Sequence, residues 1–287
     1  MSRKFTILTG LIILQLAAFS RPAGMVVPCH PQPVSMGAND SFVLKQSIAG
    51  AYSDFAVDNL GNIFLVTEAG QLKKLTASGD SVAVFNNVRQ YGKLSLIDVS
   101  NPLKVLLYYK DFGTIVILDR LLNPRATLDL RKTGLFQVRA IGQSYDNNIW
   151  VFDELESKIK RLSEDGRVLD QSTDLRLVFD SVPSPRYIVD QNRLLYLYDP
   201  MKGIYLFDYY GAFKNRIPFT GWSEFDVIGN TVYGRDAGML YKYEPGTLQL
   251  QQYPVPPAMQ DARKLKITRD CLYLLRNNGL EVYRTGS

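Results

Sequence analysis

Histidine, the residue that most often carries proton transfer and metal binding, occurs once in these 287 residues, as His30. It stands beside Cys29, and no second histidine follows it. A Ser-His-Asp triad, a pair of acid–base histidines or a multi-histidine metal site therefore cannot be assembled in the long region after residue 42. Cys29 and His30 alone supply two ligands where a closed metal site needs about four. We predict no catalytic residue, no cofactor and no bound metal, and hence no enzyme.

Carboxylates are the remaining candidates for metal chemistry, because Ca²⁺ binds carboxylate and amide oxygens. Acidic residues of this kind stand near the starts of short apolar segments, at Asp54, Asp98, Glu224, Asp226 and Asp261. Turn formation explains acidic residues at such places equally well. A Ca²⁺-dependent, lactonase-like hydrolase is therefore kept as the third alternative for the function.

Charged residues also open six regularly spaced apolar segments, at Asp54, Lys93, Arg139, Arg186, Glu224, Arg263 and Lys264. If these segments surround one opening, their side chains enter it together. The excess of basic residues then favours an anionic group, whereas solvated loop charges are the alternative interpretation. The candidate funnel site consists of Lys93, Arg139, Arg186, Glu224 and Arg263.

Aromatic residues gather between residues 196 and 222, and four of them fall at expected turns: Tyr209, Tyr210, Phe219 and Trp222. Exposed aromatic side chains of this kind often mark a protein contact surface, and they fit a sugar ring equally well. We predict that these four residues form the candidate partner surface.

A repeated sequence motif indicates the strands that must position these residues. Its anchor is a Leu or Ile, two variable residues and then a bulky apolar residue. The anchor begins at Leu72, Ile115, Ile159, Ile204, Leu240 and Leu280. By subtraction, successive anchors are 43, 44, 45, 36 and 40 residues apart. A turn residue follows most anchors, and two apolar segments precede each one, as a meander of three or four short strands requires.

Units of about 40 residues with four strands are typical of propeller blades. A β-sandwich also has closely spaced strands, but it does not repeat one sequence motif in register six times. We therefore predict an all-β, six-bladed β-propeller over residues 42–287. The last unit, Leu265 to Tyr283, holds only three strands, so we expect the N-terminal strand Phe42–Ile48 to close that blade.

The first copy, Asp58-x-x-Gly61-Asn62-Ile63-Phe64 followed by Leu72-x-x-Leu75 and Gly79, resembles the NHL-type six-bladed propeller repeat. The third copy, from Asn148 to Gly166, resembles it too, while the other four keep mainly the strand spacing. The resemblance implies the propeller fold. It leaves activity open, because propellers of this kind serve as scaffolds, ligand binders and enzymes.

Residues 1–20 carry Arg3-Lys4, an apolar run from Phe5 to Phe19 and a small-x-small site ending at Ser20. This pattern predicts a cleaved signal peptide, a periplasmic or extracellular protein and no transmembrane span in the mature chain. Residues 21–41 read as an extended lead-in. The mature chain keeps 31 Lys+Arg against 28 Asp+Glu. That excess is too small to argue for a nucleic-acid partner, and we predict none.

Cys29 and Cys271 are the only two cysteines. In an oxidising compartment they could pair and strengthen the closure of the last blade. The alternative is two separate thiols, and a lipid anchor on Cys29 is disfavoured because the cysteine lies too far beyond the apolar run.

The sequence therefore predicts a non-catalytic binding or scaffolding propeller of the cell envelope with a protein partner. The second alternative is a binder of a small ligand or carbohydrate in the central funnel. An apolar surface patch would favour the first, and a deep polar funnel would favour the second.

Overall fold

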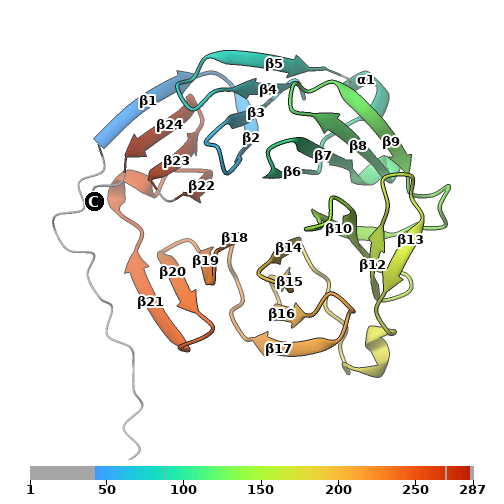
Figure 1. The fold of residues 1–287 in the computed structure, drawn as a ribbon. Coiled ribbons are helices and arrows are strands. Elements are labelled where there is room, and N and C mark those ends of the chain that lie inside the picture. Colours follow the sequence, from blue (N-terminus) through green and yellow to red (C-terminus); the bar gives the residue numbers. More distant parts are fainter. Residues whose placement is uncertain (1–42, 87, 269, 285–287) are drawn as a thin grey trace, which may run out of the picture. The chain divides into compact units, whose positions relative to one another are not determined.

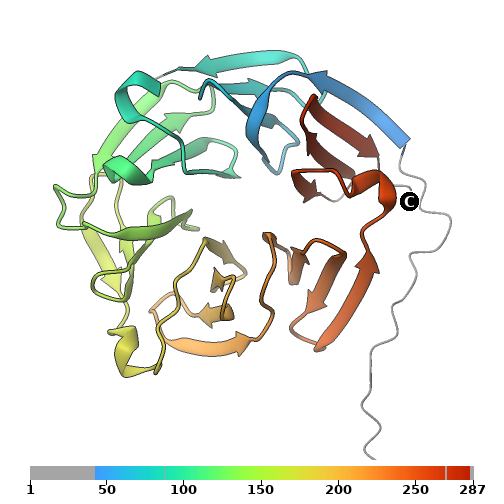
Figure 2. The same cartoon turned by 180° about the vertical axis from the view of Figure 1, so that it is seen from behind.

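The computed structural model describes residues 43–86, 88–268 and 270–284. Six four-stranded antiparallel sheets are arranged in a ring, as a six-bladed propeller (Figure 1). This confirms the predicted fold. The blades follow one another around the ring in chain order, and Figure 2 shows the same ring from behind. Within the described part of the chain, no helix is long and apolar enough to span a membrane.

Each blade is a meander that runs from an inner strand to an outer strand. We number the blades 1 to 6 from the first complete meander. The inner strands are β2 (Tyr52–Val57), β6 (Leu96–Asn101), β10 (Val138–Gln143), β14 (Tyr187–Gln191), β18 (Glu224–Ile228) and β22 (Lys264–Ile267). The second strands are β3 (Ile63–Thr67), β7 (Lys104–Tyr109), β11 (Ile149–Asp153), β15 (Leu194–Asp199), β19 (Thr231–Arg235) and β23 (Cys271–Arg276).

The third strands contain the repeated anchors. They are β4 (Leu72–Leu75), β8 (Thr114–Asp119), β12 (Lys158–Leu162), β16 (Gly203–Phe207), β20 (Met239–Glu244) and β24 (Gly279–Arg284). The outer strands are β5 (Ser81–Phe85), β9 (Pro124–Asp129), β13 (Val168–Gln171), β17 (Phe213–Ile217), β21 (Gln249–Pro254) and, for blade 6, β1 (Val43–Ala49). Among the described residues, four short helices lie in the connections: α1 (Val88–Tyr91), η1 (Lys110–Phe112), η2 (Leu175–Leu177) and η3 (Pro257–Met259).

Blade 6 is closed as the sequence predicts. β1 pairs with β24 in antiparallel register from Val43 opposite Arg284 to Ala49 opposite Gly279 (Figure 1). Blade 6 thus joins the first described strand of the chain to the last ones, so that the sheet is completed by residues far apart in sequence. The first residue of the predicted closing strand, Phe42, lies outside the described residues.

Packing between blades is the main source of core. Apolar side chains on one face of a blade interlock with those of the next, because successive residues of a strand point to opposite faces. Polar links reinforce the packing. Lys74 Nζ donates to the carbonyl oxygen of Arg120 at 2.8 Å, and Tyr108 Oη donates to that of Val138 at 2.8 Å. Burial raises the pKa of Tyr108 to about 12, so this link persists throughout the physiological pH range.

Candidate functional site

A cavity of about 670 Å³ lies on the axis of the ring. All six inner strands contribute to its wall, with residues such as Ala56, Ile97, Ile141 and Val189. Its size falls in the range of about 300–1,000 Å³ that is usual for small-molecule sites. The axis of the propeller is therefore hollow enough to hold a ligand.

The cavity extends sideways into one gap between blades. Only blade 5 contributes residues beyond its inner strand, including Tyr233, Leu240, Lys242 and Tyr253. Blade 6 faces them with Leu265 and Ile267, which also line the cavity. We call this extension between blades 5 and 6 the side chamber.

Three ion pairs gather around blades 5, 6 and 1. Lys264 Nζ lies 2.6 Å from Asp54 Oδ1, which joins the starts of β22 and β2. Lys266 pairs with Asp226 across the gap between blades 6 and 5. Arg235 lies 3.2 Å from Glu224 Oε1 within blade 5. Each carboxylate in this sector therefore has a cationic partner, and the sector carries no large net charge.

Glu224 is the most deeply placed of these carboxylates. Its Oε1 accepts hydrogen bonds from the backbone N–H of Leu265 at 2.7 Å and from Arg235. Burial raises the pKa of Glu224 above its ordinary value, against the opposing effect of those two donors. Glu224 Oε2 and Arg235 Nε are buried, and neither has a hydrogen-bond partner among the described residues. This corner of the cavity therefore carries an incompletely satisfied charge pair.

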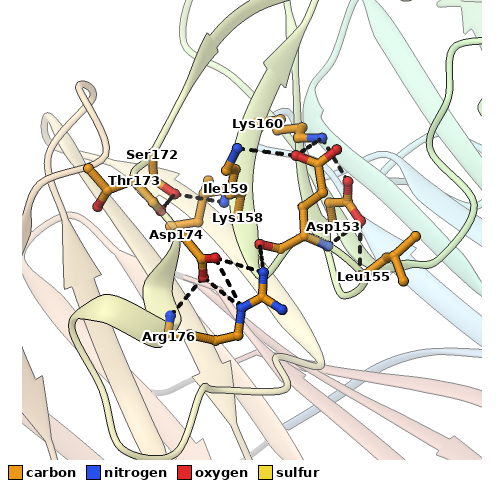
Figure 3. Close-up of polar contacts among 10 residues, drawn as sticks. Asp153, Leu155, Lys158, Ile159, Lys160, Ser172, Thr173, Asp174 and Arg176 are labelled. Atoms are coloured by element: carbon orange, nitrogen blue, oxygen red, sulfur yellow. Dashed lines mark hydrogen bonds and ion pairs between the residues drawn. The ribbon is translucent and has the colours of Figure 1, made fainter.

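Blade 3 contains a buried charge pair that is well supplied with hydrogen-bond partners (Figure 3). Asp153 is buried and ends β11 opposite Lys158, one residue beyond Phe152, which lies opposite the anchor Ile159 as Arg235 lies opposite the anchor Leu240. Asp153 Oδ2 lies 2.7 Å from Lys160 Nζ, and its Oδ1 accepts from the N–H groups of Leu155 and Glu156. The buried charge pair of blade 3 is thus closed by its own neighbours, whereas the Glu224–Arg235 pair of blade 5 borders the cavity.

The carboxylates on the far side of the cavity are used to hold blades together. Asp98 accepts hydrogen bonds from the backbone and side chain of Gln143. Asp190 accepts from Trp150 Nε1 at 2.8 Å and from the Tyr209 hydroxyl. Burial and the hydrogen bond to Asp190 together raise the pKa of Tyr209. These groups are saturated by neutral donors, so they are less suited to ligand recognition than the charged sector opposite.

The predicted funnel residues occupy the starts of inner strands, but only Glu224 lines the cavity. The side chains of Lys93, Arg139, Arg186 and Arg263 are exposed. Arg263 pairs with Glu68 and donates to the Tyr52 carbonyl, while Arg186 lies over the ring of Tyr187. At the start of a strand a long basic side chain can turn outward to water. The prediction that all five enter the funnel together is therefore wrong for these four.

The predicted partner surface is divided by the fold. Trp222 is only 3% exposed and packs against Phe219 in the core between blades 4 and 5. Tyr209 is half-buried and stacks on Tyr145 with ring centroids 4.4 Å apart. Only Tyr210 is exposed, at 88%. The expectation of one exposed patch is wrong, because the turn that carries Trp222 folds its ring inward over the glycine of β19.

The structure also bears on the alternatives for metal and cysteine chemistry. Among the described residues, no three His, Cys, Asp or Glu side chains lie close enough to hold a metal ion. Asp261, one of the candidate Ca²⁺ ligands, instead pairs with Arg276. Cys271 is half-buried. Cys29, His30 and the predicted signal peptide lie outside the described residues.

Sequence reasoning did not identify Tyr233, Lys242 and Lys266 as site residues, and named Asp226 only as a Ca²⁺ ligand. One signal was present. The anchor of blade 5 follows its predecessor by 36 residues, the shortest step in the chain. Nothing in the sequence indicated that the shortened blade leaves its polar face open.

No protein-family model matches the sequence, and no curated protein matches it. Many solved structures share the fold. Virginiamycin B lyase from Staphylococcus aureus is similar with a TM-score of 0.58 and 12% identity, over 86% of this chain and 100% of that one. The Neurospora crassa Pan2 WD40 domain gives 0.55 and 12%, over 89% and 98%.

A Bacteroides fragilis protein described as exported gives a TM-score of 0.56 and 11% identity, over 86% of this chain and 95% of that one. At such identities the likeness shows the fold alone. The neighbours include a lyase and a WD40 domain, so they do not decide between catalysis and binding.

Proposed function

We propose that this protein is a non-catalytic, NHL-type binding propeller of the cell envelope that holds a small ligand in its axial cavity. The observation that carries the proposal is the cavity itself, about 670 Å³ in volume. Its walls are largely apolar, unlike the deep polar funnel expected from the sequence, and they carry a few paired charges. That combination is characteristic of small-molecule sites. The signal-like residues 1–20 support the location, and the lack of histidine after His30 supports a non-catalytic role.

The test is a thermal-shift screen with the mature protein against sugars, amino acids, nucleotides and fatty acids. A ligand present at about 100 times its Kd stabilises by about 2.7 kcal/mol. In a protein of this size that raises Tm by roughly 5–10 °C. The matched control is Ala56→Phe, which fills the axis from β2 and should abolish the shift.

Two results would contradict the proposal. One is the absence of any shift across all four ligand classes. The other is a shift that Ala56→Phe retains in full, because the ligand would then bind outside the axial cavity.

A second candidate function, binding of an envelope protein, is favoured by the outer rim of blades 3 and 4. A hollow of about 240 Å³ there is lined by Val178, Tyr210 and Phe213, and Tyr210 is largely exposed. Mild crosslinking followed by mass spectrometry should capture one near-stoichiometric protein. Tyr210→Glu should abolish the capture, whereas Met201→Glu, at another exposed site of blade 4, should not. Equal capture by both variants would reject this surface.

A further inference from the structure

One row of side chains crosses blade 5, and three of its members, Asp226, Tyr233 and Lys242, line the cavity. In the sheet register, Asp226 lies opposite Tyr233, Tyr233 opposite Lys242, and Lys242 opposite Gln251. All four are partly exposed. Asp226 reaches blade 6 through its ion pair with Lys266, so the row faces that blade. We call these four residues the polar row.

The same row is far less polar in blades 4 and 2. In blade 4 it reads Val189, Tyr196, Leu206 and Asn215, and its two central residues are buried against blade 5. In blade 2 it reads Asp98, Leu106, Ile117 and Ala126, with Leu106 and Ile117 fully buried. Blade 5 therefore presents polar side chains where blades 4 and 2 present core.

The opposite wall is apolar. Leu265 and Ile267 of β22 pack with Leu272 and Leu274 of β23 in one cluster, which also contains Leu240 of blade 5. The side chamber thus has the polar row on blade 5 and a group of aliphatic side chains, Leu265 and Ile267 with Leu240, beside it. A ligand that fits between them needs one polar edge and one apolar face.

The ion pairs of the side chamber further restrict the class of ligand that fits it. Within the side chamber Asp226 is paired with Lys266, and Lys242 lies 3.4 Å from Glu244. A charged ligand would have to displace one of these partners. A wholly apolar ligand would cover the polar row without hydrogen bonds, which is unfavourable for each group left unpaired.

We propose that the side chamber is a subsite for a neutral sugar ring. Sugar hydroxyls can donate to the Asp226 carboxylate and accept from the ammonium groups of Lys266 and Lys242 without breaking either ion pair. The C–H face of the ring then lies against Ile267 and Leu265, and the ring of Tyr233 offers a further contact. This inference rests on the proposed function and specifies its ligand class.

The experiment is calorimetric titration of the mature protein with glucose, N-acetylglucosamine, maltose and cellobiose. Intrinsic tryptophan fluorescence, to which Trp222 on Tyr241 of the same blade contributes along with Trp150, is followed in parallel. At least one sugar should bind, with less than a twofold change in Kd between 0.05 and 0.5 M NaCl, since a neutral ligand is not screened. A preference for disaccharides would indicate the end of a glycan chain rather than a free monosaccharide.

Tyr233→Ala and Asp226→Asn should each weaken binding at least tenfold, whereas Met201→Ala, at an exposed site of blade 4, should leave it unchanged. Tyr233→Phe removes only a hydroxyl, so it allows the test if the alanine variant unfolds. It should weaken binding two- to fivefold.

The inference is overturned by no binding of any of the four sugars, or by binding that survives both chamber variants. It is also overturned by tighter binding of glucuronate or glucosamine. A thermal shift with another ligand class, lost in Ala56→Phe, would leave the proposed function standing while this inference fails.

Discussion

Blade 5 makes two very different interfaces with its neighbours. Toward blade 4 it packs Trp222, Phe225 and Tyr243 into a cluster with Tyr198 and Phe219, in which the Tyr198 and Phe225 rings stack 4.9 Å apart. Toward blade 6 it presents the polar row and encloses the side chamber. Blade 5 thus packs closely against blade 4 on one face and leaves a chamber against blade 6 on the other.

Strand alternation produces the difference with very few residues. In β19, Val232 and Gly234 face blade 4, whereas Tyr233 and Arg235 face blade 6. Gly234 has a specific purpose, because a Cβ at this position would lie 2.0 Å from the Trp222 ring. Stability and ligand access are therefore assigned to opposite faces of the same strand.

The difference between the two interfaces of blade 5 predicts that substitution of Trp222 has the largest effect on the free energy of unfolding. Trp222→Ala removes a buried ring that stacks on Phe219 and Tyr241, and should lower the free energy of unfolding by about 3–5 kcal/mol. The matched change on the other face, Tyr233→Ala, should cost less than about 1.5 kcal/mol, because Tyr233 is already partly exposed. Urea denaturation measures both, and equal losses would contradict the assignment of stability to the blade 4–5 interface.

Gly234→Ala should have the next largest effect on the free energy of unfolding. The added methyl group collides with a ring held between two others, so that Trp222 must shift, at a cost of about 1–3 kcal/mol. Trp222 fluorescence should change at the same time. The control is Gly246→Ala, since a Cβ there meets nothing within 4 Å. A Gly234→Ala protein as stable as the Gly246→Ala protein would show that the slot for Trp222 has spare room.

Glu224 should give the open interface a distinctive pH dependence. Its pKa in the folded protein is raised above 4.5, so the native state binds the proton more tightly than the unfolded state does. The free energy of unfolding should then fall as pH rises from 4.5 through the raised pKa, by at most about 1.4 kcal/mol per pH unit. Glu224→Gln should lack this decline, as measured by urea denaturation between pH 4.5 and 8.

Asp236 provides the control of opposite sign. Burial opposes ionisation of Asp236, but hydrogen bonds from Tyr241, Gly238 and Met239 outweigh it and lower the pKa below 3.8. Its contribution is present above pH 3.8 and is lost as pH falls through the lowered pKa. Asp236→Asn should therefore keep the wild-type decline above pH 4.5. If Glu224→Gln keeps it as well, Glu224 is not its source.

The ring itself could be predicted from sequence, because each blade repeats one anchor and its apolar strands regardless of what surrounds them. The closing strand followed from a count of strands in the last unit, and β1 confirms it. The site was harder to predict. Strand starts placed Glu224 correctly, but its burial depends on Arg235 and on Leu265 of the next blade. Trp222 was misplaced for a related reason, since its slot exists only through Gly234. The amino-acid sequence of a single repeat does not specify the contacts that it makes across a blade interface.

The smallest predicted effect tests whether the polar row is retained for binding or for stability. Lys242→Leu gives blade 5 the residue that blade 4 has at Leu206. The Lys242–Glu244 pair that it removes is partly exposed and contributes little, whereas the new side chain buries apolar surface against Ile267. The variant should therefore gain up to about 1 kcal/mol in unfolding free energy while losing affinity for the sugar. A protein that is both more stable and a weaker binder would show that the row is held open at the expense of stability, as expected of a functional site. A Lys242→Leu protein that loses stability and binds normally would instead make the row part of the framework.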